Sequence, residues 1–140
     1  MSRYLLDTDI ITLIQFGHAT AVRRLSAQAD ADVALSAISF QEQMRGWLGR
    51  LNKLTAPAQL ADWYDRLVAR MFPLWRRYQL LPFSLAAIQR FQQLRALRLN
   101  IGSMDLRLAA VALENNLTVV TRNVRDFGRI PGLQTEDWSV

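Results

Sequence analysis

Short apolar segments alternate with longer stretches of helical periodicity along the whole chain. The apolar segments, at residues 3–6, 33–38, 78–81, 117–121 and 133–138, have the composition of short β-strands, and the last is expected to be an edge strand. Strands that alternate with helices form a mainly parallel sheet with helices on both of its faces. The sequence therefore predicts an α/β fold with a central sheet of four to five short strands.

Polar caps and a proline mark where the intervening helices begin. Serine is a good N-cap residue, and Ser39, Ser84 and Ser103 each precede a stretch of helical periodicity. Pro57 stands near the first turn of another helix, where proline is tolerated because no N–H donor is needed. The predicted helices span residues 10–17, 19–28, 39–51, 57–73, 84–97 and 104–115.

A middle helical section, about residues 39–72, carries Trp47, Trp63 and several leucines at helical spacing. These side chains could form ordinary core or a groove for a partner, and a core with an exposed remainder is the favoured interpretation. Elsewhere, the polar segments 30–32 and 122–127 are expected to form a turn and a loop.

Length and composition restrict the class of protein. With 140 residues, 51% of them hydrophobic, the chain fits one compact domain over residues 1–140. The chain has no cysteine, which excludes disulfides and thiolate zinc sites, and its one histidine, His18, cannot form a histidine-rich metal site. Any metal ion would therefore be held by oxygen ligands. No membrane span or signal peptide is recognisable, so a cytoplasmic protein is expected.

The charge of the chain permits a nucleic-acid partner. The net charge is +5, and of the 17 basic residues all but Lys53 are arginine. The planar guanidinium suits bidentate phosphate contacts. A GC-rich genome would produce the same arginine bias without any physical cause, so the charge alone does not decide between these explanations.

One carboxylate lies where stability alone does not require it. Asp105 follows the Gly102-Ser103 helix start and so falls in the first turn of the predicted helix. Its neighbours three, four and seven residues on are Leu108, Ala109 and Ala112, an apolar face that should pack on the sheet. Asp105 is therefore expected to face the mouth of the core, although an acid in a first turn is also favoured by the helix dipole.

Two further acids are expected at the same edge of the sheet. Asp7 directly follows the first strand, and Glu42 lies in the helix that follows the second. Each has an ordinary explanation, since Asp7 could cap a helix and Ser39 with Glu42 satisfies a capping box. In a parallel sheet, however, the ends of the strands meet at one edge, where ligands bind. Three negative charges gathered there cost free energy unless a cation is bound.

A divalent cation held by these carboxylates would support phosphodiester hydrolysis. Asp7 and Asp105 are the expected direct ligands of Mg²⁺, with Glu42 acting through water or at a second metal ion. Basic side chains near the acids could bind phosphate, although ordinary solvated surface is the more common role for any one of them. The candidates are Arg45, Arg107 and Arg122.

Four segments in this order resemble the PIN domain of VapC-type toxins. They are Leu6-Asp7-Thr8-Asp9-Ile10, Ser39 through Glu42 to Gly46, Ile101-Gly102-Ser103-Met104-Asp105 before Ala109-Ala110, and Val120-Thr121-Arg122-Asn123 through to Trp138. The resemblance covers nearly the whole chain. It implies an endoribonuclease that uses Mg²⁺ or Mn²⁺ with acids at Asp7, Glu42 and Asp105, and that cuts RNA such as tRNA. It also implies a VapB-type antitoxin partner, a homodimer, and adjacent first and fourth strands.

The chain departs from this family at one position. Many PIN domains carry a fourth acid where this sequence has Asn123, which can offer a carbonyl ligand but no charge. One well-occupied metal site is therefore expected. Asp126 could partly substitute from the loop or simply cap the turn before Phe127, and Thr121 could orient a metal-bound water or finish the strand.

Two other classes of protein share part of this pattern. A receiver-like phosphorylation domain also places acids at strand ends, but it needs a lysine near its acyl phosphate, and Lys53 in the middle section is poorly placed for that role. The second alternative is a catalytically inactive PIN-like module that only binds RNA or protein. Three retained acids argue against it, because a pure phosphate binder gains nothing from clustered negative charge.

Overall fold

A five-stranded, entirely parallel sheet forms the centre of the computed structural model, which describes residues 2–140. The strand order is β3-β2-β1-β4-β5, so the first and fourth strands are adjacent, as the family resemblance implied. This sheet confirms the predicted α/β fold class. The strands are β1 (Tyr4–Leu6), β2 (Val33–Ser36), β3 (Gln79–Leu81), β4 (Thr118–Val120) and β5 (Thr135–Glu136).

The two faces of the sheet carry separate hydrophobic cores. Leu5 of β1 contributes to one core, which is closed by α6 and α7. Leu6 points to the other side and packs with residues of α1, α2 and α5. Because both leucines are fully buried, truncating either to alanine would cost roughly 2–5 kcal/mol. The helices are α1 (Thr8–Gln15), α2 (Ala19–Ser26), α5 (Phe72–Arg77), α6 (Leu85–Ala96) and α7 (Ser103–Glu114).

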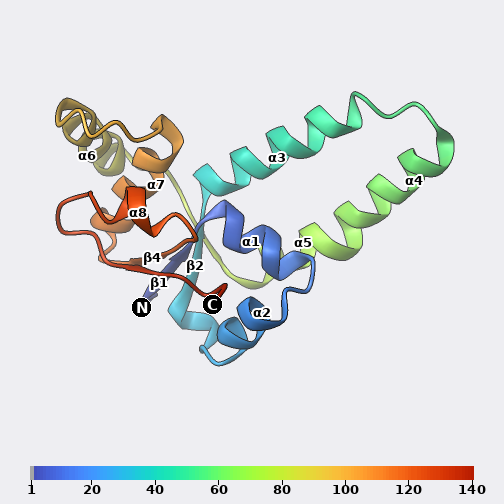
Figure 1. Ribbon diagram of the computed structural model, residues 1–140, viewed down its shortest axis with the longest axis horizontal. Coiled ribbons are helices and arrows are strands. Elements are labelled where there is room, and N and C mark those ends of the chain that lie inside the picture. Colours follow the sequence, from blue (N-terminus) through green and yellow to red (C-terminus); the bar gives the residue numbers. More distant parts are fainter. Residues whose placement is uncertain (1) are drawn as a thin grey trace.

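Two helices of the middle section form an arm that extends away from the sheet (Figure 1). They are α3 (Ala37–Leu51) and α4 (Pro57–Arg66), and no residue of α4 is buried. Trp47 is buried and stacks on Trp63 at 6.5 Å between ring centroids, and the indole N–H of Trp63 donates to the Trp47 carbonyl at 3.1 Å. The section is therefore part core and part exposed surface, as its sequence predicts. Within residues 2–140, no helix is long and apolar enough to cross a membrane.

The prediction that Ser39 caps α3 is wrong. The N-cap is Ser36, whose hydroxyl accepts from the backbone N–H of Ser39 at 3.1 Å, so the helix begins directly after β2. Ser39 is buried inside the first turn. Helix α7 likewise begins one residue early, at Ser103, with Gly102 in the cap position. Ser84, in contrast, caps α6 as predicted.

Pro73 does not end its helix. The chain passes from α4 through a π-helical segment, Leu67–Met71, into α5, and Pro73 lies in the first turn of α5. A proline is tolerated in a first turn because its missing N–H is not needed there. The 122–127 segment is also more regular than predicted, since it contains a short helix, α8 (Val124–Phe127), and the 30–32 turn is a 3-10 helix.

Candidate functional site

Asp7 is buried at the carboxyl end of β1, and both of its carboxylate oxygens accept hydrogen bonds. Oδ1 accepts from the backbone N–H of Thr8 at 2.8 Å, which makes Asp7 the N-cap of α1. Oδ2 accepts from the hydroxyl of Thr121, also at 2.8 Å. The residue therefore combines the capping role and the inward position that the sequence left as alternatives. The residue is only 6% exposed.

Thr121 connects β4 to the candidate site. It directly follows the strand and is fully buried. Its hydroxyl donates to Asp7 and accepts from the backbone N–H of Asn123 at 2.9 Å. The two bonds fix the orientation of the hydroxyl, so the Asp7 carboxylate is held from β4 as well as from α1.

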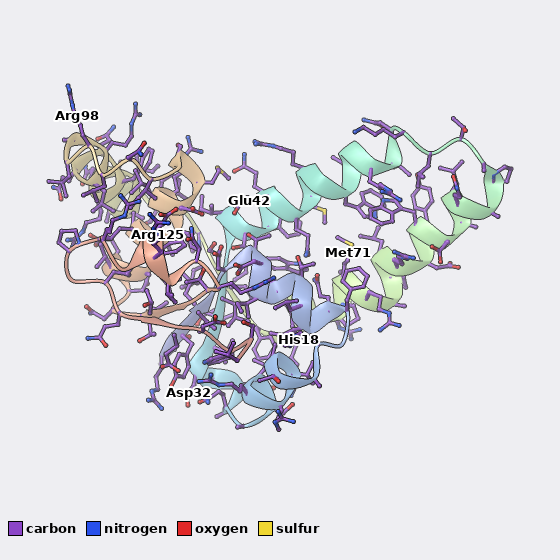
Figure 2. The ribbon with its side chains drawn as sticks, in the orientation of Figure 1. His18, Asp32, Glu42, Met71, Arg98 and Arg125 are labelled. Atoms are coloured by element: carbon purple, nitrogen blue, oxygen red, sulfur yellow. The ribbon has the colours of Figure 1, made fainter. Side chains whose placement is uncertain are left out.

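Glu42 lies on the α3 side of the site and makes no capping box. Because Ser39 is inside the helix, the capping explanation for Glu42 no longer applies. Its Oε1 instead accepts from the hydroxyl of Thr8 at 2.9 Å. Thr8, which bonds to both acids, was not singled out in the sequence. Figure 2 shows Glu42 near the start of α3, above α1.

Asp9 is a further acid of the site that the sequence analysis missed. Its Oδ2 accepts from the backbone N–H of Arg122 at 3.1 Å, while Oδ1 is buried without a hydrogen-bond partner. Burial raises the pKa of this carboxyl, and the bond from Arg122 opposes the shift. The available signal was the Asp-Thr-Asp sequence itself, in which two acids follow one strand end.

The carboxylates lie close enough to affect one another. Burial raises the pKa of Asp7 to about 7, and the negative charges of Asp9 and Asp105 contribute in the same direction. The pKa of Asp105 is also raised, first by burial and then by the charges of Glu42, Asp126 and Asp9. The structure therefore brings together the three acids singled out from the sequence, and their ionised forms carry the electrostatic cost that a cation would relieve.

The chemistry of these donors fits a divalent cation. No set of three His, Cys, Asp or Glu side chains in residues 2–140 is already arranged around one metal position. Mg²⁺, however, is usually held by one or two carboxylates, with water and substrate phosphate as its other ligands. The unpartnered oxygen of Asp9 and the raised pKa values of Asp7 and Asp105 are features that a bound cation would compensate.

Asn123 and Asp126 form a separate polar pair beside these acids. The side-chain amide of Asn123 donates to Asp126 at 3.1 Å, and Arg129 donates to the other carboxylate oxygen at 2.8 Å. These bonds lower the pKa of Asp126. Asp126 thus accepts hydrogen bonds on both oxygens, although its charge still acts on Asp105.

The three candidate arginines occupy different surroundings. Arg122 lies beside the acids, since its charge lowers the pKa of Asp9. Arg45 lines an open, largely apolar groove along α3 together with Phe40 and Leu48. Arg107 lies over the rings of two phenylalanines at the α6–α7 contact.

The chain belongs to the PIN domain family, whose model matches residues 4–133. The sequence is 30% identical to ribonuclease VapC1 of Haemophilus influenzae over 97% of this chain and 98% of the relative. It is 27% identical to the tRNA(fMet)-specific endonuclease VapC of Shigella flexneri, over 99% and 100%. The resemblance to VapC-type toxins is confirmed.

Solved structures show the same architecture. DNA-bound VapBC from Salmonella typhimurium matches with a TM-score of 0.80 and 27% identity over 99% of both chains. A toxin–antitoxin complex from Klebsiella pneumoniae matches with a TM-score of 0.70 and 25% identity, over 93% of this chain and 94% of the other.

Proposed function

We propose that this chain, as a single domain, is a metal-dependent endoribonuclease and the toxin of a type II toxin–antitoxin pair. The observation that supports the catalytic part best is the mutual electrostatic effect of Asp7, Asp9 and Asp105 at the carboxyl edge of the sheet. The relatives named ribonuclease and endonuclease match this sequence over nearly the whole chain.

In this proposal Asp7 and Asp105 hold Mg²⁺, which Mn²⁺ can replace, and Glu42 acts through water. When bound, the cation supplies Lewis-acid polarisation of the phosphate and an activated water molecule. Neighbouring groups of the chain orient the carboxylates of Asp7 and Glu42. The backbone N–H of Thr8 occupies one lone pair of Asp7 Oδ1, and the hydroxyl of Thr121 occupies one lone pair of Oδ2. The remaining lone pairs are left for a ligand. Thr8 also fixes one oxygen of Glu42.

RNA is the proposed substrate, and tRNA is the first candidate because one relative is a tRNA(fMet)-specific endonuclease. The net charge of +5 favours a polyanionic partner. The test is cleavage of a total tRNA pool by the purified chain with Mg²⁺, with Mn²⁺ and with EDTA. Asp105→Asn is the active-site variant. Asp65→Asn, at an exposed acid of α4, is the matched control for the lost charge.

Discrete fragments are expected with either metal ion from the unsubstituted chain and from Asp65→Asn, and none with EDTA or Asp105→Asn. If the chain binds the RNA pool but neither protein cuts it under any condition, the catalytic proposal fails. The alternative function, an inactive RNA- or protein-binding PIN module, would then be the better one.

An antitoxin is the proposed protein partner. Two matching structures are toxin–antitoxin assemblies, and the arm and the segment directly after it, residues 67–72, expose large apolar side chains that such a partner could cover. These side chains are Phe40, Leu48, Tyr64, Val68 and Phe72. Leu48→Ser and Val68→Ser should weaken copurification with the cognate antitoxin while leaving cleavage intact. Unchanged copurification of both variants would show that neither the arm nor the segment directly after it is the docking surface.

The tryptophans of the arm are less suitable for that test. Trp47 is buried against Trp63, so Trp47→Ala would disturb the arm itself and not just a contact surface.

We also propose that the toxin is a homodimer acting in the cytoplasm, where RNA and antitoxin are both available. Light scattering of the purified chain should give twice the mass of 16.0 kDa, and a monomer mass would contradict the dimer.

A further inference from the structure

Two arginines from neighbouring helices share one aromatic ring on the side of the molecule away from the arm. The guanidinium carbon of Arg107, on α7, lies 5.2 Å from the ring centroid of Phe91, and that of Arg95, on α6, lies 5.6 Å from it. Arg107 also lies 5.9 Å from the ring centroid of Phe83. The two rings meet edge to face at 6.0 Å.

The charges of this pair are not balanced within the chain. The Nε of Arg107 is buried without a hydrogen-bond partner, and no salt bridge in residues 2–140 involves Arg95 or Arg107. Nearby arginines differ, since Arg90 pairs with Glu114 and Arg129 with Asp126. Neither guanidinium is neutralised by a carboxylate, so each is available to donate hydrogen bonds to an anion.

The arginine pair lies beside the acidic edge but does not face it. Asp105 and Arg107 are two positions apart on α7, a spacing that sends side chains to different sides of a helix. The charges that act on the Asp105 carboxyl are all negative, so the guanidinium of Arg107 does not offset them. Figure 2 shows Arg98 and Arg125 on this same side of Glu42, opposite the arm.

We propose that Arg95 and Arg107 form a binding site for a backbone phosphate of the RNA, next to the phosphate that is cut. This inference rests on the proposed nuclease function. A single strand that crosses the acidic edge and continues over the start of α7 would bring a neighbouring phosphate to the pair. The guanidinium donates to phosphate oxygens through a planar fork. The Phe83 and Phe91 rings hold the Arg107 plane in place before binding, which reduces the entropy lost when the phosphate is bound.

The test measures binding separately from cleavage. All proteins carry Asp7→Asn to prevent cutting, and a short fluorescein-labelled single-stranded RNA is titrated at several salt concentrations by anisotropy. Arg107→Met and Arg95→Met should each raise Kd about tenfold at low salt. Removing both arginines together should reduce the slope of log K against log salt by about 0.7, the value for one phosphate contact of a single strand, and each single substitution should reduce it by part of that amount. Arg76→Met, at an exposed arginine of α5, removes the same charge elsewhere and should change both quantities little.

Two additional variants separate the phosphate site from a general effect on folding. Arg107→Lys keeps the charge and should recover only part of the affinity, because lysine lacks the planar fork. Phe83→Leu keeps Arg107 but removes one ring, and it should weaken binding by a smaller factor. Melting curves identify any variant that is unfolded at the assay temperature. The conclusion is then drawn from the folded variants of Arg95 and Arg107.

An unchanged Kd and salt slope in folded Arg107→Met and Arg95→Met would overturn the phosphate site. Equal weakening by Arg76→Met would also overturn it, because binding would then follow net charge alone. These outcomes do not depend on catalysis. Failure of the nuclease proposal would appear instead as absence of cleavage by the chain with Asp7 intact.

Discussion

At the scale of single residues, Asp7 has two opposed effects on the stability of the folded protein. Its hydrogen bond to the N–H of Thr8 stabilises the start of α1, and the loss of such a cap typically costs about 1 kcal/mol. Its burial beside other acids opposes ionisation and raises its pKa from 3.8 to about 7. A residue selected for stability alone would keep the cap without the buried charge, and asparagine does so. The carboxylate is therefore better explained by a bound cation than by the fold.

Asp7→Asn should stabilise the metal-free protein at pH 8 but not at pH 4. With a folded pKa near 7 and an unfolded value of 3.8, the folded state binds more protons between these values. The stability contributed by protonated Asp7 is therefore lost as pH rises from about 4 to 7, and it stays lost above 7. Asparagine also caps helices well and does not ionise. We expect a gain on the order of 2 kcal/mol at pH 8 from urea unfolding in EDTA.

Asp65→Asn is the control for this comparison, because its carboxylate is exposed in α4 and should give nearly the same stability as the unsubstituted chain at both pH values. An Asp7→Asn protein that is equally stabilised, or equally destabilised, at pH 4 and pH 8 would show that the ionisation of Asp7 is not the cause.

Thr121→Val should raise the pH at which cleavage becomes half-maximal. The hydroxyl of Thr121 donates to Asp7, and this hydrogen bond lowers the pKa of the carboxyl. Valine removes the donor and also leaves the backbone N–H of Asn123 without its acceptor, at a cost of roughly 1–3 kcal/mol in stability. The measurement is a pH profile of tRNA cleavage at saturating Mg²⁺. Thr121→Ser, which keeps the hydroxyl, should retain the original midpoint, and a common midpoint for all three proteins would contradict the role of this bond.

At the scale of elements, the order of strands and helices could be predicted but several helix ends could not. The alternating pattern predicted the parallel sheet because each strand is an apolar run with polar residues after it. Ser36 and Ser39 are both good caps, and the choice between them depends on where β2 leaves the sheet. Pro73 follows a π-helical turn, and nothing in its local sequence distinguishes that from a helix end.

The acids of the candidate site could be predicted because their places relative to the strands and helix starts determine where they lie in the fold. Asp7, Glu42 and Asp105 each follow a strand or begin a helix at the same sheet edge, so the topology alone brings them together. Thr8 and Asp9 act through partners that are distant in sequence, Glu42 and Arg122. Such contacts depend on how side chains from different elements meet, and the hydrophobic periodicity of the sequence does not predict this.

Gln43→Leu should loosen the contact of α3 with α1 and α5. Gln15 and Gln43 exchange two hydrogen bonds of 2.9 and 2.6 Å in a buried position, and Gln43 also accepts from the indole N–H of Trp75 at 2.7 Å. Leucine fills the space but leaves the amide of Gln15 and the indole of Trp75 short of partners, so we expect a loss of roughly 1–3 kcal/mol. Amide hydrogen exchange should become faster in the segment 67–77, which follows the arm.

Gln41→Leu is the matched control, since Gln41 is exposed on the same helix. It should leave both the stability and the exchange of residues 67–77 nearly unchanged. Faster exchange confined to α6 and α7 in Gln43→Leu would contradict this assignment of the amide pair.

At the scale of the whole molecule, the charge is divided between an overall excess of basic residues and one acidic edge. The net charge of +5 attracts RNA from any direction, whereas Asp7, Asp9 and Asp105 repel it locally. A phosphodiester can approach these acids only when their charge is compensated. The same residues therefore link cation binding, folding stability and access of the substrate.

Mg²⁺ should consequently raise the melting temperature of the chain without any RNA present, and by more at pH 8 than at pH 5.5. A ligand that binds the folded state stabilises it by mass action, with about 2.7 kcal/mol at a concentration one hundred times Kd. The raised pKa values of Asp7 and Asp105 mean that protons compete with the cation at the lower pH. Differential scanning fluorimetry with MgCl₂ against NaCl of equal ionic strength measures the effect. Asp7→Asn should lose most of the shift at pH 8 and Asp65→Asn should keep it. An equal shift in all three proteins would place the bound cation away from Asp7, even if cleavage were later found.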